Sequence, residues 1–219
     1  KNQAGRPRIP KKVPSWDDHF VVPGQIVLKL PVGSYTFEAE RGPEYKVVTG
    51  HFTIANFADD AKEVELERGA DMAAEGWWSG DLDVHRSPKE IELLMQSEDL
   101  HVVPLITWGN ERNPWSAGTL PKEPLVRLEE SRFCQLLGAQ HVRPGTTLDY
   151  FNLSALLKLG PPNADYPPLI ETLEKVRAQP GAWVEASKPF SWDVPMLVAL
   201  GQLDSIQVAH GGLGRTKSI

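Results

Sequence analysis

The stretch Gly80-Asp-Leu-Asp-Val-His85 decides how this sequence is interpreted. In an extended strand, residues two apart point to the same face, so Asp81, Asp83 and His85 would share one face. Two carboxylates and an imidazole near the carboxyl end of a strand are a suitable donor set for a divalent metal ion. The alternative is a structural role, in which the carboxylates accept hydrogen bonds from loop amides.

The chain that surrounds and follows this stretch alternates between strand and helix patterns. Strands are predicted at residues 79–85, 101–107, 148–153, 183–186 and 205–210, and helices from Ser87-Pro-Lys-Glu90 onward, at 168–178 and at 192–200. Such alternation predicts a parallel or mixed sheet that is covered by helices. The segment from Asn110 to Leu125 contains Pro and Gly and is predicted to be a long lid or binding loop.

The residues before this region have a different pattern. Short runs of period two predict a small antiparallel β-sandwich at 20–70. The five predicted strands are Gln25–Leu30, Ser34–Ala39, Tyr45–Val48, His51–Ile54 and Ala61–Leu66. Residues 1–19 are basic and rich in Pro, which predicts an extended linker. The predicted domains are therefore a linker at 1–19, a sandwich at 20–70 and an α/β domain at 75–219.

The composition of the 219 residues narrows the classes of partner. A formal net charge of -6 argues against a nucleic-acid surface, and no apolar run is long enough for a membrane span. We expect a small molecule, a glycan or a peptide as ligand, and the oligomeric state stays open. Cys134 is the single cysteine, so an intrachain disulfide is excluded. The chain starts at Lys1, which predicts a processed or trimmed product.

Several segments resemble the PHP metallohydrolases, in particular their carbaryl-hydrolase-like branch. Trp77–Arg86 resembles the first motif of that branch, in which Gly-Asp-Leu-His-x-His is common. Glu98–Thr107 is similar to the second strand of the family, and Lys188–Pro195 with Asp204–Ile206 resembles a later stretch. In the preceding module, Leu30–Phe37 resembles the hairpin of carboxypeptidase-regulatory-like and transthyretin-like domains. The fold class that follows is mixed: an antiparallel β-sandwich, then an α/β partial PHP-type barrel.

The resemblance implies a secreted or periplasmic metal-dependent hydrolase that acts on an ester, amide or phosphoester. One divalent ion of Zn, Mn or Fe is expected as cofactor. Its expected metal ligands are Asp83, His85, Glu185 and His210, and the expected catalytic pair is His85 with Asp81, which would orient the imidazole through its second ring nitrogen.

The sequence departs from the family pattern at two positions of the site. Asp83 stands where the first histidine is expected, and Trp108-Gly109 stands where Asp-His usually follows Thr107. The segment 75–219 also has about five predicted strands, whereas the family barrel has about seven. These departures leave three alternatives open: a degenerate or truncated hydrolase, a non-catalytic protein that binds a glycan or peptide through its tryptophans, and a structural surface module.

Overall fold

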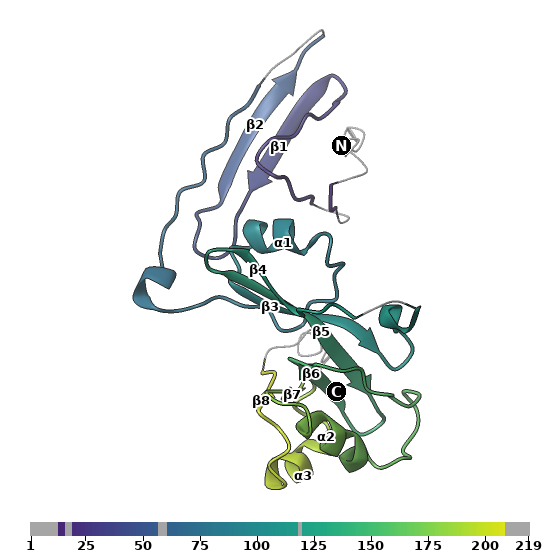
Figure 1. Ribbon diagram of the computed structural model, residues 1–219. Coiled ribbons are helices and arrows are strands. Elements are labelled where there is room, and N and C mark those ends of the chain that lie inside the picture. Colours follow the sequence, from purple (N-terminus) through teal and green to yellow (C-terminus); the bar gives the residue numbers. More distant parts are fainter. Residues whose placement is uncertain (1–12, 16–18, 57–60, 118–119, 209–219) are drawn as a thin grey trace, which may run out of the picture. The chain divides into compact units, whose positions relative to one another are not determined.

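The structure is a computed structural model that describes residues 13–15, 19–56, 61–117 and 120–208. The chain folds as two compact units (Figure 1), one formed by Lys1–Gly80 with Lys89–Val102 and the other by Asp81–Pro88 with Val103–Ile219. It is a mixed α/β protein, as predicted, and its described elements are mostly strands with three short helices. The predicted domain limits stay a prediction. The two units are interleaved along the chain, because segment 81–88 belongs to the second unit and segment 89–102 to the first. No described helix is long and apolar enough to cross a membrane.

The first unit contains a hairpin of β1 (Gly33–Ala39) and β2 (Val48–Ile54), which pair antiparallel in a two-stranded sheet. Alternate residues of both strands are half-buried on one face, as the period-two pattern requires. On that face the rings of Tyr35 and Phe52 stack with their centroids 5.5 Å apart. Gly50 lies opposite Phe37, where a side chain would collide with the ring.

The sequence predicted a five-stranded sandwich at 20–70, and the described residues form this two-stranded sheet instead. The predicted strands Tyr45–Val48 and His51–Ile54 contribute to the single strand β2. Neither Gln25–Leu30 nor Ala61–Leu66 forms a strand. In the first of these segments Ile26, Leu28 and Leu30 are half-buried and Val27 between them is 77% exposed, so the burial alternates although no strand forms. The period-two pattern of the sequence therefore identified extended segments, but it did not show which of them pair into a sheet.

A buried ion cluster stabilises the first unit next to the hairpin. The Arg68 guanidinium contacts the Asp99 carboxylate through Nη2 and the Glu44 carboxylate through Nη1, each at 2.6 Å. The guanidinium also stacks over the Tyr45 ring, 4.4 Å from its centroid, and Tyr45 and Arg68 form an isolated antiparallel bridge. Asp99 is only 4% exposed, so its charge depends on this guanidinium and on that of Arg41, which lies 3.8 Å away.

Replacing Arg68 with Ala is expected to destabilise the first unit by roughly 3 kcal/mol, because the buried Asp99 would lose the guanidinium that contacts it at 2.6 Å. Replacing Lys46 with Ala, which removes an exposed ion pair with Glu67, is the matched control and should cost less than about 1 kcal/mol. Urea denaturation followed by circular dichroism measures both changes. Equal losses in the two variants would contradict a special role for the buried cluster.

The second unit is built on a six-stranded mixed sheet with the order β3-β5-β6-β7-β8, and β4 pairs with β5. The strands are β3 (Val102–Gly109), β4 (Leu125–Glu129), β5 (Arg132–Val142), β6 (Thr147–Phe151), β7 (Trp183–Ala186) and β8 (Ser205–Ile206). The β4–β5, β5–β6 and β6–β7 pairs are antiparallel, and β7–β8 is parallel. A mixed sheet is confirmed, and the described strands do not close into a barrel.

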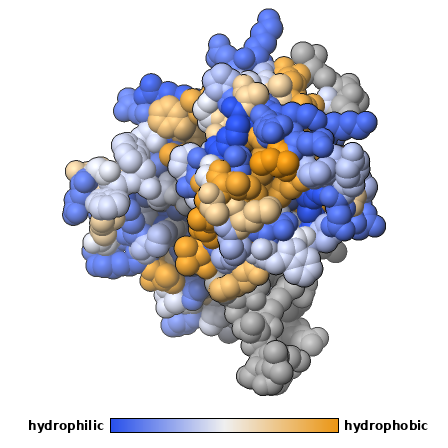
Figure 2. Space-filling view, turned by 90° about the horizontal axis from the view of Figure 1, so that it is seen from below, coloured by the Kyte–Doolittle hydropathy of each residue, from blue (hydrophilic) through white to orange (hydrophobic). Residues whose placement is uncertain are grey.

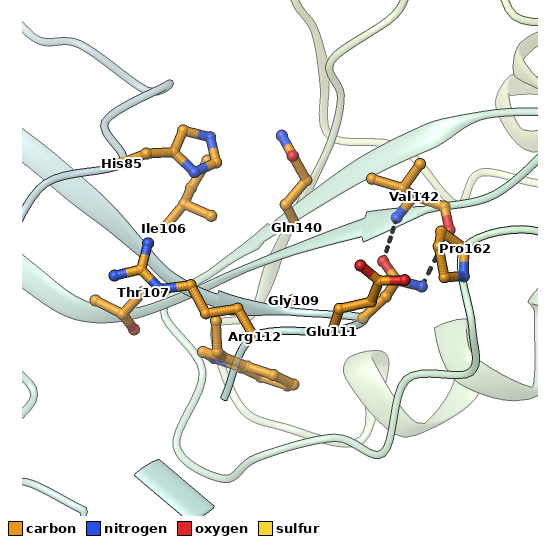
Figure 3. A pocket seen from close by; sticks show the side chains of 11 residues that line it. His85, Ile106, Thr107, Gly109, Glu111, Arg112, Gln140, Val142 and Pro162 are labelled. Carbon is orange, nitrogen blue, oxygen red and sulfur yellow. Dashed lines mark hydrogen bonds between the residues drawn. The ribbon is translucent and has the colours of Figure 1, made fainter. Parts of the chain in front are cut away.

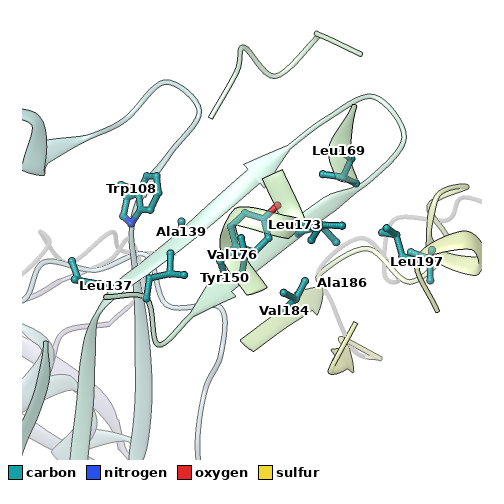
Figure 4. Close-up of a cluster of buried hydrophobic side chains, with 13 residues drawn as sticks. Trp108, Leu137, Ala139, Tyr150, Leu169, Leu173, Val176, Val184, Ala186 and Leu197 are labelled. Carbon is teal, nitrogen blue, oxygen red and sulfur yellow. The ribbon is translucent and has the colours of Figure 1, made fainter. Parts of the chain in front are cut away.

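Two helices cover one face of this sheet and form its hydrophobic core (Figure 4). They are α2 (Leu169–Arg177) and α3 (Val194–Ala199). Both predicted helices, at 168–178 and 192–200, are confirmed, and each end agrees to within two residues. Leu173, Val176 and Leu197 from these helices pack against Tyr150 and Val184 of the sheet. The first unit contains α1 (Ile91–Ser97), and the 3₁₀ turns are Ala73–Glu75 and Pro114–Ala117.

Several elements differ from the sequence prediction, and β4 and β5 of the second unit are strands that it did not contain. β5, the longest strand with 11 residues, was not predicted, because its apolar residues form no clear period of two. The predicted strand at 79–85 forms only isolated parallel bridges, from Gly80 to Val102 and from Val84 to Leu105. The helix after it begins at Ile91 rather than at the predicted cap, because 88–90 form a turn.

Candidate functional site

Four polar residues form a row across the sheet of the second unit. Gln140, Asp149, Glu185 and Ser205 are directly opposed on β5, β6, β7 and β8 in turn. Side chains alternate between the faces of a strand, so this row lies on the face opposite the one that α2 and α3 cover. Asp149 is 1% exposed and Glu185 is 3% exposed. The sheet thus places two buried carboxylates next to each other.

Asp149 is the residue with the least compensated charge in this row. Gln140 and Ser187 lie close enough to Asp149 to favour its charged form, but neither carboxylate oxygen makes a hydrogen bond of good geometry with the described residues. Glu185 Oε2, in contrast, accepts a hydrogen bond of 2.6 Å from Ser205 Oγ. Burial raises the pKa of Asp149 to about 7, the charges of Asp83 and Glu185 act in the same direction, and the nearby polar side chains of Gln140 and Ser187 oppose them. Near neutral pH this carboxyl group therefore exchanges a proton readily.

The residues of the motif at 80–85 form a second, exposed pair. His85 Nε2 lies 3.0 Å from Asp83 Oδ1, and both side chains are nearly half exposed. Asp81 Oδ1 accepts a hydrogen bond of 3.0 Å from the backbone N–H of Asp83, which is the loop-amide bond of the structural alternative. The carboxylate that contacts the imidazole is thus Asp83, and the orienting role of Asp81 stays a prediction.

The structure brings together part of the predicted metal-ligand set. Asp83 and His85 are in contact, Glu185 lies beside Asp149, and the charge of Asp83 acts on Asp149. His210 lies outside the described residues. Within the described part of the chain, no three His, Cys, Asp or Glu side chains are placed to hold a metal ion together. Sequence reasoning missed Asp149, although a single carboxylate inside the apolar run Thr147–Phe151 was a signal for it.

A small pocket adjoins this site (Figure 3), with a volume of about 220 Å³. Gln140, which is paired with Asp149 across the strands, lines it together with His85. The other lining residues come from the end of β3 and the loop after it, with Val142 and Pro162 on the far side. Trp108 contributes to this wall but is 2% exposed and belongs to the hydrophobic core. The pocket is smaller than the roughly 300 Å³ at which pockets for drug-sized ligands begin.

Other buried ionisable groups of the second unit have structural partners. His141 Nδ1 lies 2.9 Å from the Tyr150 hydroxyl, and burial, together with the charge of Arg143, lowers the pKa of His141 to about 4. Burial raises the pKa of the Cys134 thiol to about 12, which leaves it protonated and unreactive at neutral pH. These residues stabilise the core and do not contribute to the site.

The chain was compared with protein-family models, with curated proteins and with solved structures, and it matches none of them.

The raised pKa of Asp149 predicts how stability depends on pH. Between about pH 4 and pH 7 the folded chain keeps a proton on Asp149 that the unfolded chain, with an ordinary pKa of 3.8, has lost. The contribution of this group to the free energy of unfolding therefore falls as pH rises through that window, by up to about 1.4 kcal/mol per pH unit. The Asp149→Asn variant lacks this group, so its stability relative to wild type should rise from about pH 5 to pH 7 and then level off.

Urea denaturation of both proteins in EDTA, at several pH values, measures this difference. The titration of His141 has the opposite sign, because its proton is bound by the unfolded chain and not by the folded one. It is present in both proteins and cancels in the comparison. Stability curves that run parallel between about pH 4 and pH 7 would show that Asp149 ionises normally in the folded chain.

Proposed function

We propose that this chain is a PHP-like metal-dependent hydrolase of an ester, amide or phosphoester, secreted or periplasmic, with a reduced or incomplete metal centre. The observation that supports this most is the Asp149 carboxylate, which is buried without a hydrogen-bond partner among the described residues and lies beside a second buried carboxylate, Glu185. A buried carboxylate without a partner is compensated either by a proton or by a cation. Asp83 and His85 would add the oxygen and imidazole donors that suit Zn²⁺, Mn²⁺ or Fe²⁺, provided that they move toward the two buried carboxylates, because no three of these side chains are placed to hold an ion together in the described chain.

Each residue of this set would have a distinct role. Asp149 and Glu185, on adjacent strands, would hold the ion from the sheet, and His85 with Asp83 would approach it from the loop. His210, a predicted ligand, would add a second imidazole. A bound divalent ion polarises the scissile group and lowers the pKa of a water molecule. At the pocket, Gln140 is placed to orient a substrate by hydrogen bonding, since its carboxamide both donates and accepts.

Metal binding to the chelator-free chain tests this proposal. Added Mn²⁺ or Zn²⁺ should raise the melting temperature and release about half a proton at pH 7, rising toward one proton at lower pH, because Asp149, whose pKa is about 7, must ionise to act as a ligand. The Asp149→Asn and His85→Ala variants should lose most of this stabilisation. Asp165→Asn, a change of the same type at an exposed carboxylate, should retain it. Calorimetry in two buffers of different ionisation enthalpy counts the protons, and unchanged melting with every ion would refute the proposal.

The second candidate function is a non-catalytic glycan- or peptide-binding protein, and exposed aromatic residues favour it. Trp192 and Phe190 are 76% and 84% exposed in the segment before α3, and Trp77 and Trp78 are both more than half exposed in the other unit. Flat aromatic faces of this kind stack on sugar rings. Apolar side chains also gather near the middle of the face seen from the α3 end (Figure 2), and they would add apolar contacts to a bound ligand. Glycan binding that is lost in Trp192→Ala and independent of metal would support this candidate over the hydrolase.

A further inference from the structure

The loop after β3 is fixed at the rim of the pocket by an unusual number of hydrogen bonds. The Asn110 carboxamide donates to the backbone carbonyls of Val142 and Gly160, at 3.0 and 2.6 Å, and accepts from the Val142 N–H at 2.7 Å. The Gly109 N–H donates to the Arg112 carbonyl at 2.7 Å and closes the loop. A Cβ atom on Gly109 would lie 2.8 Å from the Gln140 carbonyl oxygen, so glycine permits this close approach.

This anchoring positions one cationic side chain, Arg112, on the pocket. The Arg112 side chain forms no hydrogen bond or ion pair with the described part of the chain, and the residue is exposed. In Figure 3 its guanidinium lies on the same side of the pocket as the His85 ring, whereas the Glu111 carboxylate points toward Val142 and Pro162 on the other side. A fixed backbone with an unpaired guanidinium at a pocket is preorganised to receive an anion.

We propose that the substrate carries a small anionic group, a carboxylate or a phosphate, and that Arg112 binds this group in the pocket beside His85. The planar guanidinium donates two parallel N–H bonds, which match the oxygens of either anion. The volume of about 220 Å³ limits the bound part to a group the size of a substituted ring. This inference rests on the proposed function, because the ester, amide or phosphoester bond to be cleaved would have to lie near His85.

Anion binding is tested on the whole chain in EDTA, with benzoate and phenyl phosphate as probes and benzamide as the uncharged analogue. Titration calorimetry should detect binding of at least one anion and much weaker binding of benzamide. Arg112→Gln should weaken the anion by about tenfold or more, the loss expected for a charge-assisted hydrogen bond. Arg127→Gln removes the same charge from a side chain on β4 that donates hydrogen bonds to the backbone carbonyls of Glu129 and Glu130 and lies over the Phe133 ring. This change should alter Kd less than about twofold.

The variants also separate this inference from the proposed function. Arg112→Lys keeps the positive charge but loses the two parallel N–H donors of the guanidinium. If that geometry matters, its affinity for the anion should lie between those of Arg112→Gln and wild type. Binding of benzamide as tight as benzoate, or equal affinities in wild type and Arg112→Gln, would overturn the anion site. If Mn²⁺ binds but neither anion does, this inference fails and the hydrolase proposal stands. If the anions bind through Arg112 but no metal binds, the hydrolase proposal fails and the anion site stands.

Discussion

The burial of β6 on both of its faces constrains the whole second unit. Leu148 and Tyr150 face α2 and α3, which shield them from water, and Asp149 faces the other way and is buried too. A carboxylate that water cannot reach requires polar neighbours, and the strand on one side provides Gln140, whereas Glu185 on the other side adds a like charge that favours the protonated form of Asp149. The apolar face therefore determines where the sheet packs, and the polar face determines which chemistry it can support.

Two pairs of groups with opposite surroundings meet at this polar face. The buried pair, Asp149 with Glu185, has little access to water, and the exposed pair, Asp83 with His85, lies on a segment that only isolated bridges hold to β3. The electrostatic effect of Asp83 on Asp149 couples the two pairs. The sheet thus holds Asp149 and Glu185 in place, whereas Asp83 and His85 lie on a loop that can move more easily. Such an arrangement suits a metal centre whose ligands come together only when a cation binds.

Local patterns in the sequence predicted those elements whose stability is local. The helix at 168–178 was correct because Leu173 and Val176 recur with helical spacing, and the strand at 183–186 because it is short and bounded by turns. β5 was not predicted, because its sequence has no clear period of two. It is a strand because it pairs with β3, β4 and β6. In the site, Asp83 and His85 were identified from their spacing of two. The proximity of Asp149 to Glu185, 36 positions later, results from strand pairing that no local pattern contains.

The interleaved boundary between the two units affects the order in which they mature during synthesis. Arg68 leaves the ribosome well before its partner Asp99, and the segment 81–88, which belongs to the second unit, emerges between them. The first unit therefore cannot complete its ion cluster until part of the second has already been translated. Domains that follow each other along a chain generally fold one after the other as they emerge. Here the first unit is closed only after the chain has begun the second, so the two units do not follow each other strictly along the chain.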